Sequence, residues 1–407
     1  MAPYRLRVLY LVPGHHLLPS AGPSRNALNL ARGLSRFAEV TLAFRRILER
    51  PAEEPCPLLE LDPACPLPDR PRDDAATRGI GALALCAYLR RLDAFAACHF
   101  AAFDLVLEKS WLFSGRLALR AQRQGALGVA VENFLPDPRR HGRGLLKRLR
   151  LALAARSMGH NLRRLPLVIA ETETLKRALV ARFGLAPERV AVVPLGIDRR
   201  LFRPRPKQEA RAALGLAPAA RILLYVGVLD RTHDLMPLFE ALSALRGRLP
   251  EGLVLHLLGD GEREAHYRAY AAEHRLPVRF HGRVPHERVP LWIAAADLCL
   301  APYDPAVFAG GELAYATMKI PEYLAVGRPV AAVASGRARE LVRDGINGFL
   351  IPPTAAAWRR LLADFPPPAR LEAMAAAAAR TPLWDWEDTA RAYLDACLKV
   401  RTPVGRS

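Results

Sequence analysis

The stretch Lys-Ile-Pro-Glu-Tyr-Leu-Ala-Val-Gly-Arg-Pro-Val, residues 319–330, decides the fold. Its residues 320–326 form a helical run, which Gly327 ends and which Pro329 prevents from continuing. The run that follows, residues 330–333, is short and apolar, as in a buried strand. A helix that leads through a glycine turn into a buried strand is typical of a parallel sheet.

The same alternation of strand and helix runs through the whole chain. Strand-type runs are predicted at residues 5–12, 40–44, 105–107, 129–131, 167–170 and 190–193, and again at 222–226, 253–258, 278–280, 298–301, 330–333 and 348–351. A helix is predicted near residues 24–36, whereas the Pro- and acid-rich residues 49–74 are interpreted as a long loop. This alternation predicts an α/β chain with two doubly wound, Rossmann-like domains.

The chain is long enough for two domains of ordinary size, since it has 407 residues. The Pro- and Arg-rich residues 202–206 are suited to a linker. We therefore expect domains at residues 1–200 and 201–375, followed at residues 376–407 by a C-terminal helix that crosses back to the first domain. Ligands should bind at the carboxyl ends of the strands and in the cleft between the domains.

Net charge is the unusual feature of the composition. The 59 Lys and Arg against 40 Asp and Glu give +19. Residues 1–200 hold 32 basic and 18 acidic residues, or +14, which leaves +5 for the remainder. A bias toward Arg explains part of this excess, but the asymmetry predicts a phosphate-rich or anionic membrane partner for the first domain. Nucleic acid is disfavoured, because the basic segments lack interleaved aromatic residues.

The composition also excludes several classes of protein. A mean hydropathy of +0.04 and a hydrophobic content of 51% exclude a disordered chain. No apolar run is long enough to span a bilayer, and the six cysteines show neither a CxxC pair nor metal-ligand spacing. We expect a cytoplasmic protein, with peripheral binding to the inner face of the membrane as an open alternative.

Seven pieces of the sequence form an ordered set. They are Val-Val-Pro-Leu-Gly-Ile-Asp (192–198), Tyr-Val-Gly-Val-Leu (225–229), Leu-Leu-Gly-Asp-Gly (257–261), Phe-His-Gly-Arg-Val-Pro (280–285), Ala-Ala-Asp-Leu (295–298), the stretch 319–330, and Arg-Asp-Gly-Ile-Asn-Gly-Phe-Leu (343–350). Together they resemble the retaining glycosyltransferases of family 4, closely over residues 165–352 and loosely before them. The resemblance implies the GT-B architecture, in which two Rossmann-like domains face each other across a cleft. It also implies an acceptor site in the first domain and a nucleotide diphosphate sugar in the second.

The resemblance further implies the residues of the donor site. Lys319 begins a helix whose free N–H groups favour phosphate, and Glu322, one turn later, would bind the ribose hydroxyls. The turn at residues 282–284 would border the nucleobase. The expected catalytic residues are Lys319, Glu322 and Arg231, and the expected donor-binding residues are Gly227, His233, Gly282, Arg283, Val284, Ala316, Thr317 and Glu312.

Three positions depart from the pattern of the family. Val228 and His233 replace an Arg and a Lys that grip the pyrophosphate, so Arg231 is expected to supply the missing charge. Ala314 replaces the first acid of a paired-glutamate motif. Glu132 stands where the family has a histidine, and we assign it to the acceptor site.

The acceptor is also expected to contact the loop at residues 13–25. Gly22 would let a substrate approach the following helix, and Ser24 would cap that helix. His15 and His16 are interpreted as loop histidines. The chain has no GxGxxG followed by an acid and no DxD, so a nicotinamide enzyme is disfavoured and transfer without a metal or cofactor is expected.

Two alternative functions stay open. A nucleotide-sugar epimerase of the same fold would use the donor site without an acceptor. A catalytically lapsed nucleotide-sugar or nucleic-acid binding protein is suggested by Val228, by Ala314 and by the net charge of +19.

A basic segment motivates a membrane-linked acceptor. Residues 139–164 contain no acid and nine bases, at positions 139, 140, 143, 147, 148, 150, 156, 163 and 164. A helix would separate bases from apolar residues, with Arg143, Lys147 and Arg150 on one face and Leu145, Leu149, Ala152 and Leu153 on another. Such a helix either docks on anionic membrane and receives a lipid-linked or cell-envelope glycan, or packs its apolar stripe against the sheet.

Overall fold

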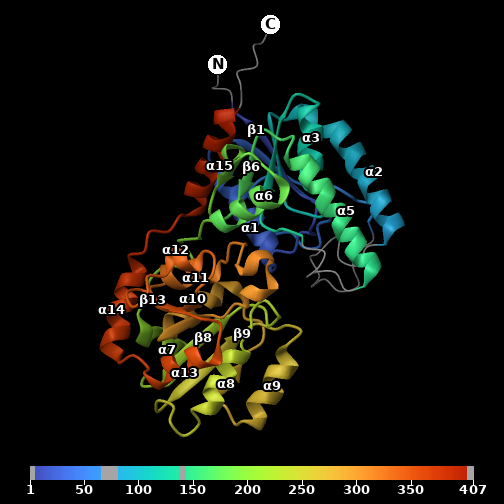
Figure 1. Ribbon diagram of the computed structural model, residues 1–407. Coiled ribbons are helices and arrows are strands. Elements are labelled where there is room, and N and C mark those ends of the chain that lie inside the picture. Colours follow the sequence, from blue (N-terminus) through green and yellow to red (C-terminus); the bar gives the residue numbers. More distant parts are fainter. Residues whose placement is uncertain (1–4, 66–80, 137–143, 401–407) are drawn as a thin grey trace. The chain divides into compact units, whose positions relative to one another are not determined.

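The computed structural model describes residues 5–65, 81–136 and 144–400 (Figure 1). Their contacts divide the chain into two compact units. The first unit comprises Met1–Gly196, Ala314–Ala316 and Trp384–Ser407, and the second comprises Ile197–Leu313 and Thr317–Leu383. Each unit contains one sheet, and all the strand pairs in both sheets are parallel.

The first unit is built on a seven-stranded sheet with the order β3-β2-β1-β4-β5-β6-β7. The strands are β1 (Arg7–Val12), β2 (Glu39–Phe44), β3 (Leu58–Glu60), β4 (Leu105–Lys109), β5 (Leu127–Glu132), β6 (Val168–Ala170) and β7 (Val190–Val192). The helices are α1 (Gly22–Leu34), α2 (Ala82–His99), α3 (Arg116–Gln122), α5 (Leu145–Leu162), α6 (Glu173–Phe183) and α15 (Trp386–Val400). Every residue of β4 is buried, as expected for a strand covered on both faces.

The second unit is built on a six-stranded sheet with the order β10-β9-β8-β11-β12-β13. The strands are β8 (Arg221–Val226), β9 (Leu253–Leu258), β10 (Val278–Phe280), β11 (Leu298–Ala301), β12 (Val330–Val333) and β13 (Gly348–Ile351). The helices are α7 (Lys207–Leu214), α8 (Met236–Ala244), α9 (Glu264–Glu273), α10 (Val289–Ala295), α11 (Lys319–Ala325), α12 (Ala338–Leu341), α13 (Ala355–Ala363) and α14 (Pro368–Ala379). Residues 319–330 form α11 and lead into the first residue of β12.

The predicted α/β class and every predicted strand are confirmed. One strand, β3, was not predicted, because it lies inside residues 49–74, which were interpreted as a loop. It is three residues long and pairs with β2, with Leu58 opposite Leu42. Residues 66–74 of the expected loop lie outside the described residues.

Each sheet has one point at which the strand order reverses. In the first unit, β1 lies between β2 and β4, so the connections that follow β1 and β4 leave the sheet in opposite directions. In the second unit, β8 and β11 are neighbours in the same way. The crevice outside the carboxyl ends of two such strands is where α/β proteins bind ligands.

Helix α15 belongs to the first unit although it follows the second unit in the chain. It packs on α1 at Gly33, where a Cβ atom would lie only 2.4 Å from the carbonyl oxygen of Trp386 (Figure 1). Only glycine permits this approach, so the sequence of α1 is adapted to α15.

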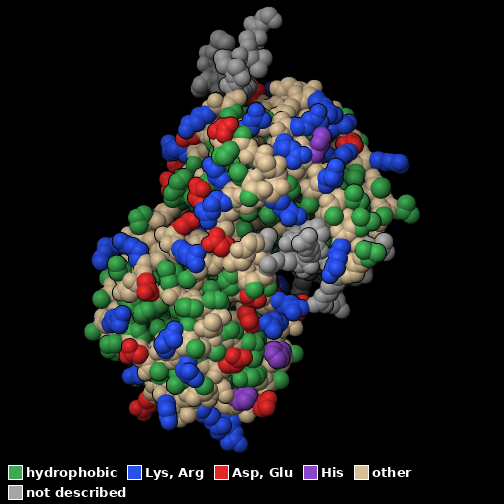
Figure 2. Space-filling view, viewed as in Figure 1, with side chains coloured by type: hydrophobic (Ala, Val, Ile, Leu, Met, Phe, Trp, Pro, Cys, Tyr) green, Lys and Arg blue, Asp and Glu red, His purple; other side chains and the backbone are tan. Residues whose placement is uncertain are grey.

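Basic side chains are scattered over the face of the first unit that Figure 2 shows, and hydrophobic side chains gather near α2 and one end of α5. None of the helices in the described ranges is both long enough and apolar enough to cross a membrane.

Candidate functional site

The candidate site of the second unit lies at the carboxyl ends of β8 and β11. The loop after β8 carries Gly227, Arg231 and His233, and the segment after β11 leads through Thr317 to α11. Lys319 is the first residue of α11 and Glu322 follows one turn later. Because β8 and β11 are neighbours, these two loops meet at the point where the strand order reverses.

The ammonium group of Lys319 is buried and has no hydrogen-bond partner among the described residues. Its Nζ atom lies 4.7 Å from the centre of the Tyr225 ring and 5.0 Å from that of Tyr303, and ring faces attract a cation. Burial lowers the pKa of Lys319 to about 7, although the charges of Asp230 and Glu322 act in the opposite direction. The site therefore holds a cation without a direct counter-ion.

His233 is held beside this lysine by Asp230. Its Nδ1 and its backbone N–H lie 2.9 and 3.0 Å from Oδ1 of Asp230, so the ring donates to the carboxylate through Nδ1. Burial and the neighbouring charge of Lys319 lower the pKa of His233 to about 4. The neutral ring then presents Nε2 as a hydrogen-bond acceptor, and it donates to a phosphate only after it takes up a proton.

Gly227 lies close to the ammonium group of Lys319. A Cβ atom there would lie 2.9 Å from Nζ of Lys319 and 3.0 Å from the hydroxyl of Tyr225, and φ is +150°, which side chains disfavour. The hydroxyl of Tyr225 in turn donates to the carbonyl oxygen of Val228 at 2.6 Å. The glycine thus leaves room for an ammonium group that any larger residue would displace.

The turn expected to border the nucleobase joins the same edge of the sheet. Gly282 has φ +64° and its carbonyl oxygen accepts from the N–H of Gly259 at 2.6 Å. Arg283 donates from Nε to both carboxylate oxygens of Asp260, at 2.8 and 2.9 Å. Val284 is half-buried in the loop that follows β10. The Arg283 side chain is therefore engaged with a carboxylate of its own unit.

The remaining expected donor residues differ in their surroundings. Thr317 is buried and its hydroxyl is hydrogen-bonded to that of Tyr303, next to Lys319. Arg231 is exposed in the β8 loop. Glu312 instead pairs with Arg339, 2.9 Å from its Nη1. Ala316 belongs to the short segment that groups with the first unit.

Gly22 and Ser24 lie at the start of α1, in the first unit, after the β1 loop. The cap prediction for Ser24 was wrong: the residue before the helix is Ala21, which makes no side-chain cap. The hydroxyl of Ser24 is fully buried, accepts from the N–H of Leu18 at 3.1 Å and donates to the carbonyl of His16 at 3.2 Å. Ser24 therefore fixes the shape of the β1 loop, because its hydroxyl satisfies two backbone groups of that loop.

Glu132 ends β5 and is fully buried. One carboxylate oxygen accepts from the hydroxyl of Ser114, whereas Oε2 has no partner among the described residues. Burial raises the pKa of Glu132 to about 7, against the opposing effect of the Ser114 hydrogen bond. Glu108, at the end of β4, has its pKa raised to about 8 for the same reason. The carboxyl edge of this sheet thus holds carboxyl groups that are partly neutral near pH 7.

Sequence reasoning missed three residues that lie around Lys319 and His233 in the candidate site, namely Tyr225, Tyr303 and Asp230. Tyr225 lies within one of the quoted motifs, but strand periodicity alone does not show that its ring supports a cation. Asp230 stands three residues before His233, and that spacing in a loop was the one available signal.

Comparisons with known proteins identify the family of the chain. Residues 21–201 match the family model described as Glycosyltransferase Family 4, and residues 220–364 match the model Glycosyl transferases group 1. A relative from Streptomyces scabiei named D-inositol 3-phosphate glycosyltransferase is 31% identical over 337 residues, which are 76% of this chain and 71% of the relative. The chain belongs to glycosyltransferase family 4.

Other relatives of this glycosyltransferase match over shorter stretches. A protein of the same name from Thermobispora bispora is 34% identical over 260 residues, 58% of each chain, so the match covers little more than half of that relative. Among solved structures, Anabaena HepE in complex with UDP-glucose has a TM-score of 0.72 at 17% identity, covering 97% of this chain and 100% of that one. This likeness concerns the fold, and with the two parallel sheets it shows that the glycosyltransferase has the GT-B architecture.

Proposed function

We propose that this glycosyltransferase moves a sugar from a nucleotide diphosphate sugar to an acceptor hydroxyl, with retention and without a metal. The observation that carries the proposal is the buried ammonium group of Lys319, which has no hydrogen-bond partner among the described residues and lies where the strand order reverses. A buried cation without a direct partner is costly unless an anion binds to it, and the pyrophosphate of a donor is such an anion. HepE, which shares the fold, binds UDP-glucose, and this favours the same class of donor here.

The roles of the residues follow from charge. In the reaction the bond between the anomeric carbon and the diphosphate oxygen breaks, and the acceptor oxygen bonds to the same face of the sugar. The acceptor proton passes to the departing phosphate oxygen. Lys319 and Arg231 stabilise the negative charge that develops on the diphosphate, and Glu322 accepts hydrogen bonds from the ribose. The turn at residues 282–284 borders the base, and Glu132 with the β1 loop orients the acceptor.

Turnover measured with a panel of UDP-, GDP- and ADP-sugars tests the proposal. Glu322→Ala and Lys319→Ala should each lower kcat/KM by roughly ten- to hundredfold, because each removes a charged hydrogen bond. Glu340→Ala and Lys399→Ala remove exposed side chains of the same types and serve as controls. Wild-type kinetics in the Lys319 and Glu322 variants would contradict the assignment.

The same panel separates the alternatives. An epimerase would convert the donor sugar with no acceptor present. A lapsed enzyme would bind a nucleoside diphosphate but neither hydrolyse nor transfer any donor.

We also propose that α5 docks on anionic membrane and brings the protein to a lipid-linked or cell-envelope glycan. On this helix Leu145, Leu149 and Leu153 are 83%, 56% and 59% exposed. Ala154 and Met158, on the opposite side of the helix, are buried. The apolar stripe is therefore available to an interface, and neighbouring bases supply attraction of about 1 kcal/mol each near an anionic surface. Arg139, Arg140 and Arg143 and the side chain of Lys147 lie outside the described part of the chain.

Liposome flotation tests the docking. Wild-type protein should float with anionic vesicles at low salt and not with neutral ones, and salt should weaken the binding. Leu149→Ser combined with Leu153→Ser should abolish flotation, whereas Leu83→Ser, which changes an exposed leucine on α2, should not. Failure to bind anionic vesicles at low salt would exclude docking and leave the transfer proposal intact.

A further inference from the structure

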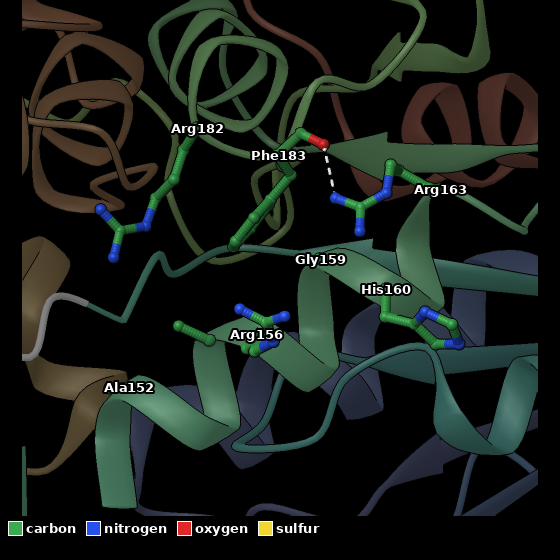
Figure 3. A pocket seen from close by; sticks show the side chains of 8 residues that line it. Ala152, Arg156, Gly159, His160, Arg163, Arg182 and Phe183 are labelled. Atoms are coloured by element: carbon green, nitrogen blue, oxygen red, sulfur yellow. Dashed lines mark hydrogen bonds between the residues drawn. The ribbon is translucent and has the colours of Figure 1, made fainter. Parts of the chain in front are cut away.

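A groove in the first unit lies between α5 and α6. It has a volume of about 530 Å³ and is lined chiefly by Ala152, Arg156, Gly159, Arg163, Arg182 and Phe183 (Figure 3). A volume of this size is typical of pockets that take small ligands.

The position of the groove follows from the topology. Its residues come from α5 between Ala152 and the C-cap Arg163, and from the last two residues of α6, and both helices end shortly before β6 and β7 begin. They therefore lie toward the amino ends of those strands, whereas Glu132 and the β1 loop lie at the carboxyl ends of theirs. A ligand in the groove would not occupy the proposed acceptor site.

Close packing of α5 on α6 shapes the groove. The Phe183 ring lies against the backbone of α5 at Gly159, where a Cβ atom would be 2.6 Å from Cδ1 of the ring. Arg163 fixes the same end, since its Nη1 donates to the carbonyl oxygen of Phe183 at 2.9 Å (Figure 3). The walls are thereby held in place without any bound molecule.

The charge of the groove has one sign. Arg156 on α5 and Arg182 on α6 stand on opposite walls, and neither guanidinium makes an ion pair or hydrogen bond with another described residue (Figure 3). None of the lining residues is acidic, and His160 adds a further nitrogen base. Both side chains are exposed, and an anion held in the groove would lower the repulsion between their like charges.

We propose that this groove binds a phosphate monoester, with Arg156 and Arg182 each donating to the phosphoryl oxygens from one wall. Guanidinium groups form planar, charge-assisted pairs with phosphate, which a dianion can accept from two sides at once. The phosphate can belong to a soluble ester or to the headgroup of a lipid. The exposed Leu149 and Leu153 lie on the same helix, close to the lining residue Ala152, and would contact the chain of such a lipid.

Calorimetry with the full chain tests whether the groove binds a soluble phosphate ester. The titrant is glycerol 1-phosphate, and all proteins carry Lys319→Ala so that the donor site adds little to the signal. Arg156→Gln with Arg182→Gln should weaken binding by about ten- to hundredfold, as expected for the loss of charged hydrogen bonds. Arg90→Gln with Arg123→Gln removes the same charge from exposed positions elsewhere in the unit and should leave binding unchanged.

Vesicle binding tests whether the groove binds the headgroup of a lipid. Phosphatidic acid carries a phosphate monoester and phosphatidylglycerol does not, so vesicles of matched charge separate recognition of the ester from general attraction. A groove-dependent preference for phosphatidic acid supports a lipid source, and a groove-dependent response to glycerol 1-phosphate alone supports a soluble one. The proposal is overturned if neither probe binds, or if the groove variant and the control variant lose the same affinity. Since the donor site is disabled throughout, neither result bears on sugar transfer.

Discussion

The Nζ atom of Lys319 lies over the ring of Tyr225, 4.7 Å from its centre, with no hydrogen-bond partner among the described residues. A ring face compensates only part of the hydration that a buried ammonium group loses. The pKa of Lys319 is therefore close to neutral pH, and the charge of its amine depends on what occupies the site. This coupling gives the first of four predictions.

Binding of a nucleoside diphosphate should be accompanied by proton uptake. With a pKa of about 7 the free Lys319 is largely neutral at pH 8, and a bound pyrophosphate would raise that pKa and protonate the amine. Calorimetric titration with UDP in buffers of different ionisation enthalpy should show uptake approaching one proton per site at pH 8 and little at pH 6. Lys319→Met should remove the dependence, and uptake that persists in that variant would assign it elsewhere, with His233 the first candidate.

Gly227→Ala should disable the donor site. The new methyl group would meet Nζ of Lys319 at 2.9 Å in a backbone conformation that alanine disfavours. We expect at least a tenfold loss of nucleoside diphosphate affinity and a stability loss of about 1 kcal/mol. Gly81→Ala is the matched control, because its Cβ would meet nothing within 4 Å. Unchanged affinity in the Gly227 variant would show that the ligand does not depend on the position of the lysine.

Glu132→Gln should change how stability depends on pH. The pKa of Glu132 rises on folding from 4.5 to about 7, because the buried site favours the neutral carboxyl group. The contribution of Glu132 to the free energy of unfolding is therefore complete below pH 4.5 and is lost as pH rises through 7. The neutral glutamine avoids this loss, and the variant should exceed wild type by about 1–3 kcal/mol at pH 8 and match it near pH 4.5. Urea unfolding at the two pH values measures the difference. A constant offset between the two proteins would mean that folding does not raise the pKa of Glu132.

Arg231→Ala should separate recognition of the phosphates from recognition of the nucleoside. Arg231 is exposed in the same loop as His233, so it is free to reach a diphosphate without disturbing the fold. We expect a loss of about tenfold or more in affinity for UDP and almost none for uridine. Thermal-shift titrations with both ligands provide the comparison. An equal loss for UDP and uridine would show that Arg231 does not contact the phosphates.

The strands could be predicted from sequence because each is a short apolar run bounded by turn residues. The exception was β3, whose three residues form a strand only because the edge of β2 is available to pair with them. Such pairing depends on partners distant in sequence, and no local pattern records it. The same applies to Ser24, whose hydroxyl bonds to the backbone of a folded loop in place of the helix start.

The arrangement of the candidate donor site could be predicted in part for a related reason. Lys319 and Gly227 stand in recognisable motifs, so their proximity was expected. Tyr303 reaches the lysine because β11 lies beside β8, and strand order cannot be read from the sequence of either strand. The basic face expected on α5 stays a prediction, because Arg143 and the Lys147 side chain lie outside the described residues. The spacing alone could not decide which side of the helix faces the sheet. Leu149 and Leu153 are exposed, whereas Ala154 and Met158 on the other side pack inward.

The contact between Gly33 and Trp386 sets an order of events during synthesis. Most of the first unit is complete when Gly196 leaves the ribosome, yet α15 begins only at Trp386. At typical translation speeds the intervening chain takes about 10–40 s to make. Throughout that interval the side of α1 that receives α15 is uncovered, while the whole second unit is being made. The first unit therefore cannot complete its packing until nearly the whole chain has been synthesised.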